Sequence, residues 1–253
     1  MPVINRLHRR SAQGAELEIY RNLYTRILLR AGQKTEGIVL GITSATPGEG
    51  KTITALNLAR AFAEDRRLAS SSGQHRERLL GGKIGSQILD QGRLPHRGTP
   101  SDVLIIDCNE GRVRASHKLE VQELPGLTDY LTGSCSLNDI IRVTKTPQLA
   151  VIPVGASPDS LMVLIGSEGM RDLIEAVRWR FALVVVDLPA VLAGADTQAM
   201  TPLVDYLLMV VRSGQVSQKD LKRALELIEP QKLIGTVLND RRRTLPNWLD
   251  QLF

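Results

Sequence analysis

The feature that most constrains the fold is the stretch of residues 38–52, which has the sequence IVLGITSATPGEGKT. It opens with an apolar, β-branched run that predicts a buried strand. A turn rich in Pro and Gly follows, and residues 53–62 then show the spacing of apolar side chains that is typical of a helix. A strand, a glycine-rich loop, Gly-Lys-Thr and a helix, in this order, make up the phosphate-binding P-loop.

The residue types in this loop suit phosphate chemistry. Gly48 and Gly50 allow backbone N–H groups to turn toward phosphate oxygens, and the start of the following helix adds its positive dipole end. Lys51 can reach the β- and γ-phosphates, and the Thr52 hydroxyl can ligate Mg²⁺. Ala45 departs from the strict motif, which has glycine at that position. The alternative interpretation is a strand, turn and helix that contain Gly-Lys-Thr by chance.

The composition is that of a cytoplasmic α/β protein. With 253 residues and 43% hydrophobic content, the chain can form one good-sized core. A net charge of +5 permits contact with nucleic acid or a membrane surface without requiring it. Cys108 and Cys135 imply no disulfide framework. We find neither a membrane-spanning run nor a secretory signal, so we expect the chain in the cytoplasm, with any membrane contact made through a partner.

Six apolar runs separated by helical patterns predict a mostly parallel sheet with helices on both faces, the three-layer P-loop NTPase-like fold. After the run that begins at residue 38, the expected strands are residues 102–107, 149–155, 181–187, 206–211 and 233–238. The expected helices beyond the P-loop helix are residues 126–133, 137–141, 159–180 and 217–229.

The expected domain division places an N-terminal extension at residues 1–36 and the nucleotide-binding domain at residues 37–253. The extension has a loose lead-in and an amphipathic helix over residues 16–31. This helix either packs on the chain's own core or contacts another subunit. Residues 65–100 are rich in Ser, Gly, Gln and Arg, and we interpret them as an inserted loop.

Three polar side chains follow predicted strands and are therefore expected at the same edge of the sheet as the P-loop. Asp187 can hold Mg²⁺ beside Thr52, directly or through water. Asp107 can ligate the metal or position an attacking group. Asn239 follows the last strand. The structural alternatives are a helix N-cap or turn aspartate for Asp187, a purely structural acid for Asp107 and a turn residue for Asn239.

These motifs resemble those of the bacterial tyrosine kinases of capsule and exopolysaccharide systems (BY-kinases, CpsD/CapB type). That family belongs to the deviant P-loop ATPases, which include the partitioning and septum-site proteins. Residues 43–52 resemble its first nucleotide motif, and Thr46 stands where the partitioning ATPases carry an additional lysine, which favours the kinase branch. Residues 103–109 resemble the second motif, and residues 184–190 resemble the third, with Asp187 in the metal-binding place.

The chain departs from the family pattern at several positions. Asn109 replaces the second acid of the second motif, and Gly111 replaces an arginine, whereas Arg112 matches the next one. Glu18 and Arg21 match a Glu-x-x-Arg-x-x-Arg subunit motif, but Tyr24 replaces its last arginine. The family's kinases phosphorylate a tyrosine cluster at the end of the chain, and this chain has four tyrosines, none of them in its tail.

The resemblance implies a Mg²⁺- and ATP-dependent protein tyrosine kinase that regulates exopolysaccharide or capsule production. It implies a membrane-spanning chain-length regulator as partner and a possible homo-oligomer, and no nucleic-acid partner is expected. The expected roles are catalysis by Lys51 and Asp107, and metal binding by Thr52, Asp107 and Asp187. The expected nucleotide contacts are Thr46, Pro47, Gly48, Glu49, Gly50, Lys51, Thr52, Ile53 and, at the adenine edge, Asn239. Two alternatives stay open: an ATP-binding switch without transferase activity, and a partitioning-type positioning ATPase.

Overall fold

The computed structural model describes residues 3–4, 13–32, 36–71, 101–109, 114–156 and 161–240. Gly111 and Arg112 lie outside the described residues, as do most of the expected insertion at 65–100 and the part of the chain after residue 240.

The described strands form one eight-stranded sheet in the order β1-β8-β7-β2-β6-β3-β5-β4. All neighbouring strands are parallel except β4 and β5, which are antiparallel. Their bounds are Val3–Ile4 (β1), Ile38–Ser44 (β2), Ser101–Asp107 (β3), Arg142–Val143 (β4), Gln148–Ile152 (β5), Leu183–Asp187 (β6), Tyr206–Arg212 (β7) and Leu233–Asn239 (β8). The six predicted strands are confirmed. The sequence did not predict β1 and β4, because two residues are too few to show a pattern.

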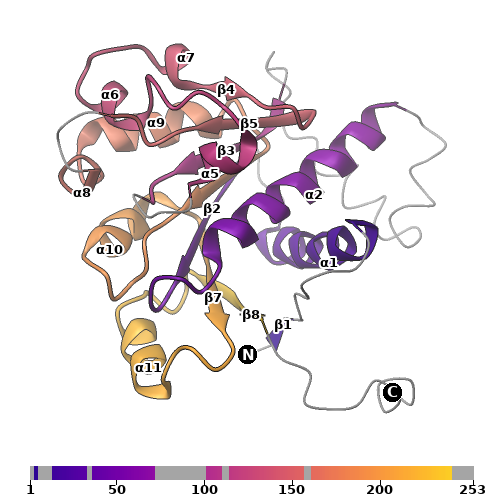
Figure 1. Cartoon of the computed structure of the whole chain (residues 1–253), viewed down its shortest axis with the longest axis vertical. Coiled ribbons are helices and arrows are strands. Elements are labelled where there is room, and N and C mark those ends of the chain that lie inside the picture. Colours follow the sequence, from indigo (N-terminus) through magenta and orange to yellow (C-terminus); the bar gives the residue numbers. More distant parts are fainter. Residues whose placement is uncertain are drawn as a thin grey trace.

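Helices cover both faces of the sheet, as predicted, and the two long helices α1 and α2 lie side by side on one face (Figure 1). The helices are Gln13–Ala31 (α1), Lys51–Ser71 (α2), Ala115–Leu119 (α5), Leu127–Leu131 (α6), Leu137–Ile140 (α7), Leu161–Leu164 (α8), Glu168–Arg178 (α9), Asp196–Met200 (α10) and Gln218–Glu226 (α11), with a 3₁₀ turn at Thr201–Leu203 (η1).

Three expected boundaries were wrong. The helix expected over residues 159–180 is two helices, because Ser167 caps a new helix by accepting a hydrogen bond from the backbone N–H of Met170 at 3.3 Å. Helix α2 continues to Ser71, so residues 65–71 belong to a helix and not to an inserted loop. Helix α11 ends at Glu226, before the expected stop at Pro230.

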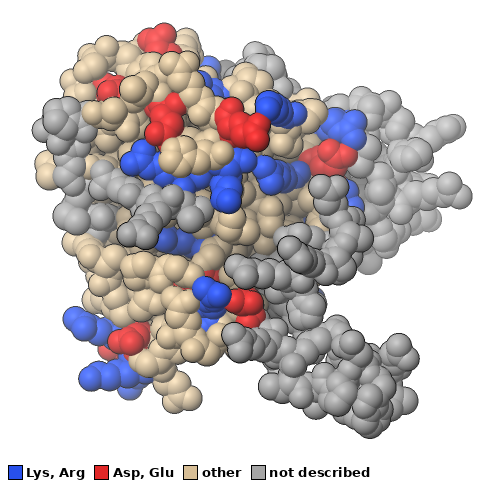
Figure 2. All heavy atoms as spheres, viewed as in Figure 1, with Lys and Arg blue, Asp and Glu red and all other residues tan. Residues whose placement is uncertain are grey.

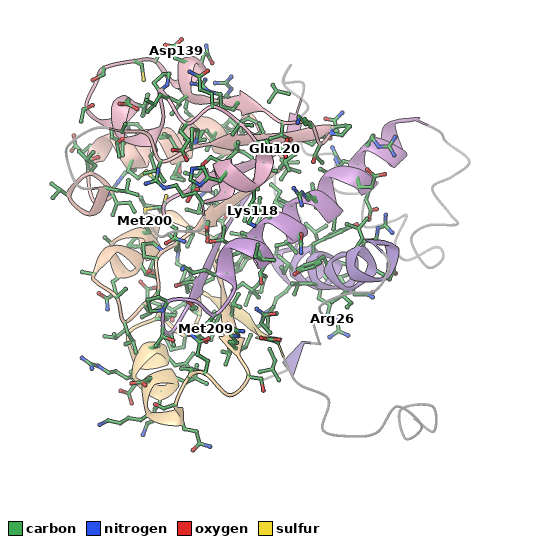
Figure 3. The ribbon with its side chains drawn as sticks, in the orientation of Figure 1. Arg26, Lys118, Glu120, Asp139, Met200 and Met209 are labelled. Atoms are coloured by element: carbon green, nitrogen blue, oxygen red, sulfur yellow. The ribbon has the colours of Figure 1, made fainter. Side chains whose placement is uncertain are left out.

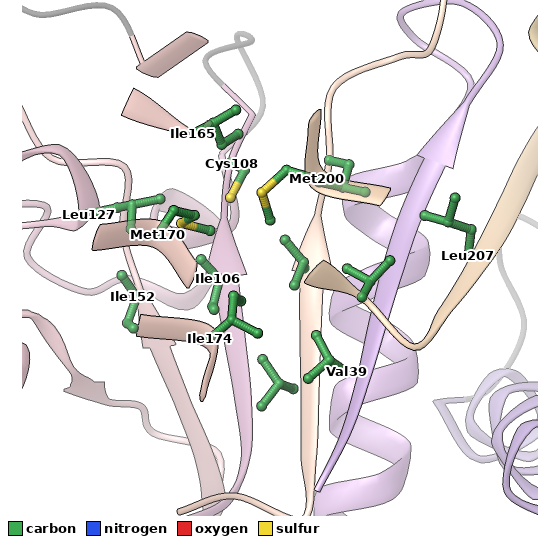
Figure 4. Packing of buried hydrophobic residues seen from close by; sticks show 14 of the residues in the cluster. Val39, Ile106, Cys108, Leu127, Ile152, Ile165, Met170, Ile174, Met200 and Leu207 are labelled. Carbon is green, nitrogen blue, oxygen red and sulfur yellow. The ribbon is translucent and has the colours of Figure 1, made fainter. Parts of the chain in front are cut away.

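Two hydrophobic clusters lie on opposite faces of the sheet, because successive side chains of a strand point to opposite faces. Leu40 of β2 packs in the cluster beneath α1 and α2, and its neighbour Val39 packs in the cluster on the other face. Figure 4 shows the second cluster, in which Ile106 of β3 and Met170 and Ile174 of α9 are buried together. The three layers therefore hold the carboxyl ends of the central strands on a rigid core.

Helix α1 packs on the P-loop helix α2 through a buried polar contact. The Tyr24 hydroxyl donates a hydrogen bond to the Asp65 carboxylate of α2, and Arg21 Nε donates to the same group at 2.8 Å. Arg21 also pairs with Glu18 at 3.4 Å. The interpretation that this helix packs on its own core is confirmed, and a subunit contact through its exposed side stays a prediction.

Candidate nucleotide-binding site

The loop that connects β2 to α2 requires glycine at two positions. Gly48 and Gly50 have φ angles of +86° and +96°, in the left-handed region that side chains disfavour. A Cβ atom on Gly50 would also lie 2.1 Å from Nδ2 of Asn239, so the Asn239 side chain at the end of β8 would have to move to admit a larger residue.

Glu49 braces this loop from inside the protein. Its side chain is fully buried, and Oε1 accepts hydrogen bonds from the backbone N–H and the hydroxyl of Thr46, at 2.6 and 2.9 Å. Oε2 accepts from the backbone N–H of Arg212 at the end of β7, at 3.0 Å. The Glu49 side chain and the Thr46 N–H are therefore used within the protein and are not free to contact a phosphate. Pro47 and Ile53, also expected at the nucleotide, are exposed at the loop and in the first turn of α2.

Residues that the sequence analysis missed hold the outer side of the loop. The Gln215 side chain donates to the carbonyl of Pro47 at 3.0 Å. Arg212 forms a two-bond contact with Asp240, at 2.9 and 2.6 Å, and its Nη1 lies 3.5 Å from the carbonyl of Gly48. Arg212 ends β7, Gln215 follows it, and Asp240 follows β8. Their position at the end of an apolar run is the sequence signal that could have identified them.

Asn239 lies at the loop, but its amide has partners within the chain. Nδ2 donates to the carbonyl of Glu49 at 2.9 Å, and Oδ1 accepts from the backbone N–H of Asp240 at 2.9 Å. The expected contact of Asn239 with an adenine edge stays a prediction.

The two strand-end acids are direct neighbours, since Asp107 of β3 and Asp187 of β6 are partners in register. Thr52 donates its hydroxyl to Oδ2 of Asp187 at 2.6 Å, and Asn109 Nδ2 donates to that hydroxyl at 3.2 Å. Oδ1 of Asp187 is buried, and no described residue donates a hydrogen bond to it. The structure therefore brings Thr52, Asp107 and Asp187 together, as the sequence predicted.

Asp107 differs from Asp187 because backbone donors occupy both of its oxygens. Oδ1 accepts from the N–H of Asn109 at 3.1 Å, and Oδ2 accepts from the N–H of Ala115 at 2.7 Å. These bonds hold the segment after β3 against the site. Within the described part of the chain, Asp187 is therefore the acid with an oxygen that accepts no hydrogen bond.

Burial dominates the electrostatics of the site. Desolvation raises the pKa of Asp107, and it raises the pKa of Asp187 to about 7 with help from the neighbouring Asp107 carboxylate. Burial also lowers the pKa of Lys51, whereas Asp187, Asp107 and Glu49 act in the opposite direction. A divalent cation beside Asp187 would offset the cost of burying its charged form.

The donor set fits a magnesium ion held together with a nucleotide. Among the residues that the structure describes, no three His, Cys, Asp or Glu side chains form a metal cluster by themselves. Mg²⁺ sites commonly use one or two carboxylates together with substrate phosphates and water. The unbonded buried oxygen of Asp187 and the adjacent Thr52 hydroxyl match that pattern.

Comparison with known proteins gives relatives that include tyrosine-protein kinases and a polysaccharide transport protein, although no protein-family model matches the chain. The chain is 26% identical over 224 residues to tyrosine-protein kinase CpsD of Streptococcus pneumoniae, covering 88% of this chain and 83% of the relative. It is 33% identical over 144 residues to tyrosine-protein kinase ptk of Acinetobacter johnsonii, a match that covers 56% of this chain and 20% of that longer protein. It is 29% identical over 211 residues to the succinoglycan biosynthesis transport protein ExoP of Rhizobium meliloti, covering 81% of this chain and 22% of ExoP.

Solved structures show the same fold. The kinase domain of Escherichia coli tyrosine kinase ETK superimposes with a TM-score of 0.72 at 25% identity, covering 95% of this chain and 86% of that one. The septum site-determining protein MinD of Pyrococcus horikoshii, solved with Mg-ADP, superimposes with a TM-score of 0.59 at 17% identity, covering 85% and 76% of the two chains. The chain is thus a relative of the bacterial tyrosine kinases and has the P-loop fold that these share with MinD.

Proposed function

We propose that this protein binds ATP with Mg²⁺ and transfers the γ-phosphoryl group to protein tyrosine in a capsule or exopolysaccharide system. The observation that carries the proposal is the group formed by Lys51, Thr52 and Asp187 at the start of α2 and the end of β6. In this group a buried carboxylate oxygen accepts no hydrogen bond from any residue that the structure describes. The kinase names of the relatives and the ExoP transport protein support the choice of reaction and system.

In the proposed reaction the chain's own residues bind and orient the phosphates. Gly48 and Gly50 expose loop N–H groups, and Lys51 stabilises negative charge on the β- and γ-phosphates. Thr52 and Asp187 would hold Mg²⁺, which neutralises charge on the phosphate oxygens when bound. The brace through Glu49 keeps the loop in its binding geometry before the nucleotide arrives, which lowers the cost of binding.

Asp107 is proposed to orient the acceptor or to ligate the metal as a second acid. Two backbone hydrogen bonds fix its position. Its raised pKa supports a role in accepting a proton, since a base is most effective when its pKa lies near the working pH.

The proposed cellular setting rests on the relatives. We place the protein in the cytoplasm, at the inner face of the membrane through a membrane-spanning chain-length regulator, and allow for a homo-oligomer. None of the described helices is long and apolar enough to cross a membrane.

A nucleotide-dependent switch without phosphoryl transfer is the second candidate. Two observations favour it. Asn109 places an amide beside Thr52, and an amide cannot act as a general base. Asp107, the neighbouring acid, already accepts two backbone hydrogen bonds.

Labelling with [γ-³²P]ATP and Mg²⁺, followed by analysis for phosphotyrosine, separates the candidates. The protein is incubated alone and with a random Glu-Tyr copolymer. Label on tyrosine is the expected result. Nucleotide binding without label would favour the nucleotide-dependent switch over the kinase. Steady ATP hydrolysis with ATP-dependent dimerisation and no phosphoprotein would indicate a positioning ATPase.

A further inference from the structure

The complete set of tyrosines lies within the described residues, so the possible internal acceptors can be compared directly. The chain has four tyrosines: Tyr20, Tyr24, Tyr130 and Tyr206. A phosphoryl acceptor must expose its hydroxyl and must be able to carry a dianion afterwards without being forced against a buried carboxylate.

Two of the four tyrosines are unsuited to this role. Tyr20 and Tyr24 are 1% and 3% exposed, between α1 and α2. The Tyr20 hydroxyl accepts a hydrogen bond from Asn57 at 3.3 Å, and the Tyr24 hydroxyl donates to Asp65. A phosphate on Tyr24 would lie against that buried carboxylate, which is strongly unfavourable.

Tyr206 lies at the wrong edge of the sheet. It is the first residue of β7, so it lies at the amino ends of the parallel strands, whereas the P-loop follows the carboxyl end of β2. Its hydroxyl lies 3.5 Å from the carbonyl of Ala31 at the end of α1.

Tyr130 lies at the same edge as the candidate site. It belongs to α6, whose first two residues are fixed to the segment after β5: Leu127 N–H donates to the carbonyl of Pro153 at 2.8 Å, and Thr128 N–H donates to that of Val154 at 2.9 Å. Strand β5 is the neighbour of β3, which ends at Asp107. Helix α6 is therefore held beside the carboxyl ends of the strands that carry the site.

Tyr130 is more exposed than Tyr20 and Tyr24. The residue is half-buried, with its ring packed at the margin of the core, and no described residue forms a hydrogen bond with the hydroxyl. The adjacent Asp129 carboxylate is occupied, since it accepts from the N–H of Gly126 at 2.7 Å and from that of Ala156 at 3.4 Å.

The face of the molecule seen in Figure 2 carries charges of both signs. Figure 2 shows Asp and Glu side chains in its upper part, with a band of Lys and Arg side chains below them. The exposed residues Lys118 of α5, Glu120 and Asp139 are labelled in Figure 3.

We propose that Tyr130 is the tyrosine of this chain that accepts the phosphoryl group, an inference that rests on the proposed kinase function. The phenolic oxygen attacks the γ-phosphorus of ATP, a new oxygen–phosphorus bond forms, and the bond to the β,γ-bridging oxygen breaks. ADP leaves with that oxygen, and the phenolic proton passes to solvent. The products are phosphotyrosine at position 130, ADP and one proton.

The test compares the full chain with Tyr130→Phe and, as a matched control, Tyr206→Phe. Each protein is incubated with [γ-³²P]ATP, Mg²⁺ and a random Glu-Tyr copolymer, and label on the chain and on the copolymer is counted separately. Tyr130→Phe is expected to lose most label on the chain and to keep wild-type label on the copolymer, whereas Tyr206→Phe keeps both.

The experiment distinguishes failure of the Tyr130 assignment from failure of the proposed kinase function. Wild-type label on the chain in Tyr130→Phe, or a wild-type protein that labels the copolymer but not itself, would overturn the assignment of Tyr130 and leave the kinase function in place. A wild-type protein that labels neither would overturn the kinase function and, with it, this inference. Mapping of the phosphopeptide by mass spectrometry must place the label at residue 130.

Discussion

Asp187 and Thr52 come from distant parts of the sequence and form a 2.6 Å hydrogen bond in which only one oxygen of the carboxylate takes part. The other oxygen is buried without a donor among the described residues. Burying a charged carboxylate oxygen without a hydrogen-bond donor costs free energy in the protein without ligand. A cation bound to this oxygen, beside the P-loop threonine, would offset that cost.

Replacing Asp187 by Asn is expected to remove the dependence of nucleotide affinity on Mg²⁺. The Asn oxygen can still accept from Thr52, so the fold is kept, but the charge that binds the metal is lost. We expect ATP affinity in Mg²⁺ to fall by at least about tenfold and to match the affinity measured with a chelator. Titration calorimetry with and without Mg²⁺ checks this, and a variant with wild-type Mg²⁺ dependence would contradict the assignment.

The affinity for Mg-nucleotide should rise with pH between about 6 and 8. The pKa of Asp187 is raised to about 7 by burial and by Asp107, and the protonated form cannot bind a cation, so protons compete with the metal below that pH. Binding isotherms are measured at several pH values for the wild type and for Asp187→Asn. The nucleotide titrates equally in both series, so the difference between them reports the titration of the Asp187 carboxyl. A wild-type profile parallel to that of the variant would exclude it as the titrating group.

Replacing Lys51 by Ala is expected to abolish measurable ATP binding. The ammonium group is buried beside Asp107 and Asp187, where a charge-assisted contact with phosphate is worth about 1.5–3 kcal/mol or more. Lys219→Ala, an exposed lysine of α11, serves as the control in a fluorescent-nucleotide binding assay. Wild-type affinity in Lys51→Ala would mean that the site is elsewhere.

Replacing Glu49 by Gln should weaken nucleotide binding without unfolding the chain. One carboxylate oxygen becomes an NH₂ group, which must face a backbone donor of Thr46 or Arg212. The lost bond and the donor–donor contact cost about 1–3 kcal/mol, and we expect an affinity loss on the order of tenfold. Glu226→Gln, on the exposed side of α11, should bind as the wild type. Equal nucleotide affinities for the two variants would show that the hydrogen bonds of Glu49 do not hold the loop in the conformation that binds nucleotide.

Replacing Tyr24 by Phe should destabilise the α1–α2 contact. The Asp65 carboxylate is buried and would keep Arg21 but lose the hydroxyl donor, at a cost of about 1–2 kcal/mol. Tyr206→Phe loses a long, 3.5 Å contact with the carbonyl of Ala31 and should change the free energy of unfolding by less than about 0.5 kcal/mol. Urea denaturation measures both, and equal midpoints for the two variants would contradict the importance of the buried contact.

The sequence was informative where one residue type has few structural alternatives. Gly48 and Gly50 were assigned to the loop because only glycine readily takes positive φ, and both have it. The apolar strands were found because a strand buried on both faces has a nearly continuous apolar sequence. Helix ends were less certain, as Ser167 shows: its capping role depends on the backbone turning there, and the continuous helical pattern on either side gave no sign of it.

The P-loop, the mostly parallel three-layer fold and the edge of the sheet where Asp107 and Asp187 end their strands could be predicted from the amino-acid sequence, because periodicity and glycine spacing are local properties of the chain. The distinction between side chains that serve the site and side chains that support it emerged from the folded structure. Glu49 faces inward, Asn239 lies under Gly50, and Arg212 and Gln215 hold the loop. These contacts join residues more than a hundred positions apart, and hydrogen bonds of that kind depend on how the strands are ordered in the sheet.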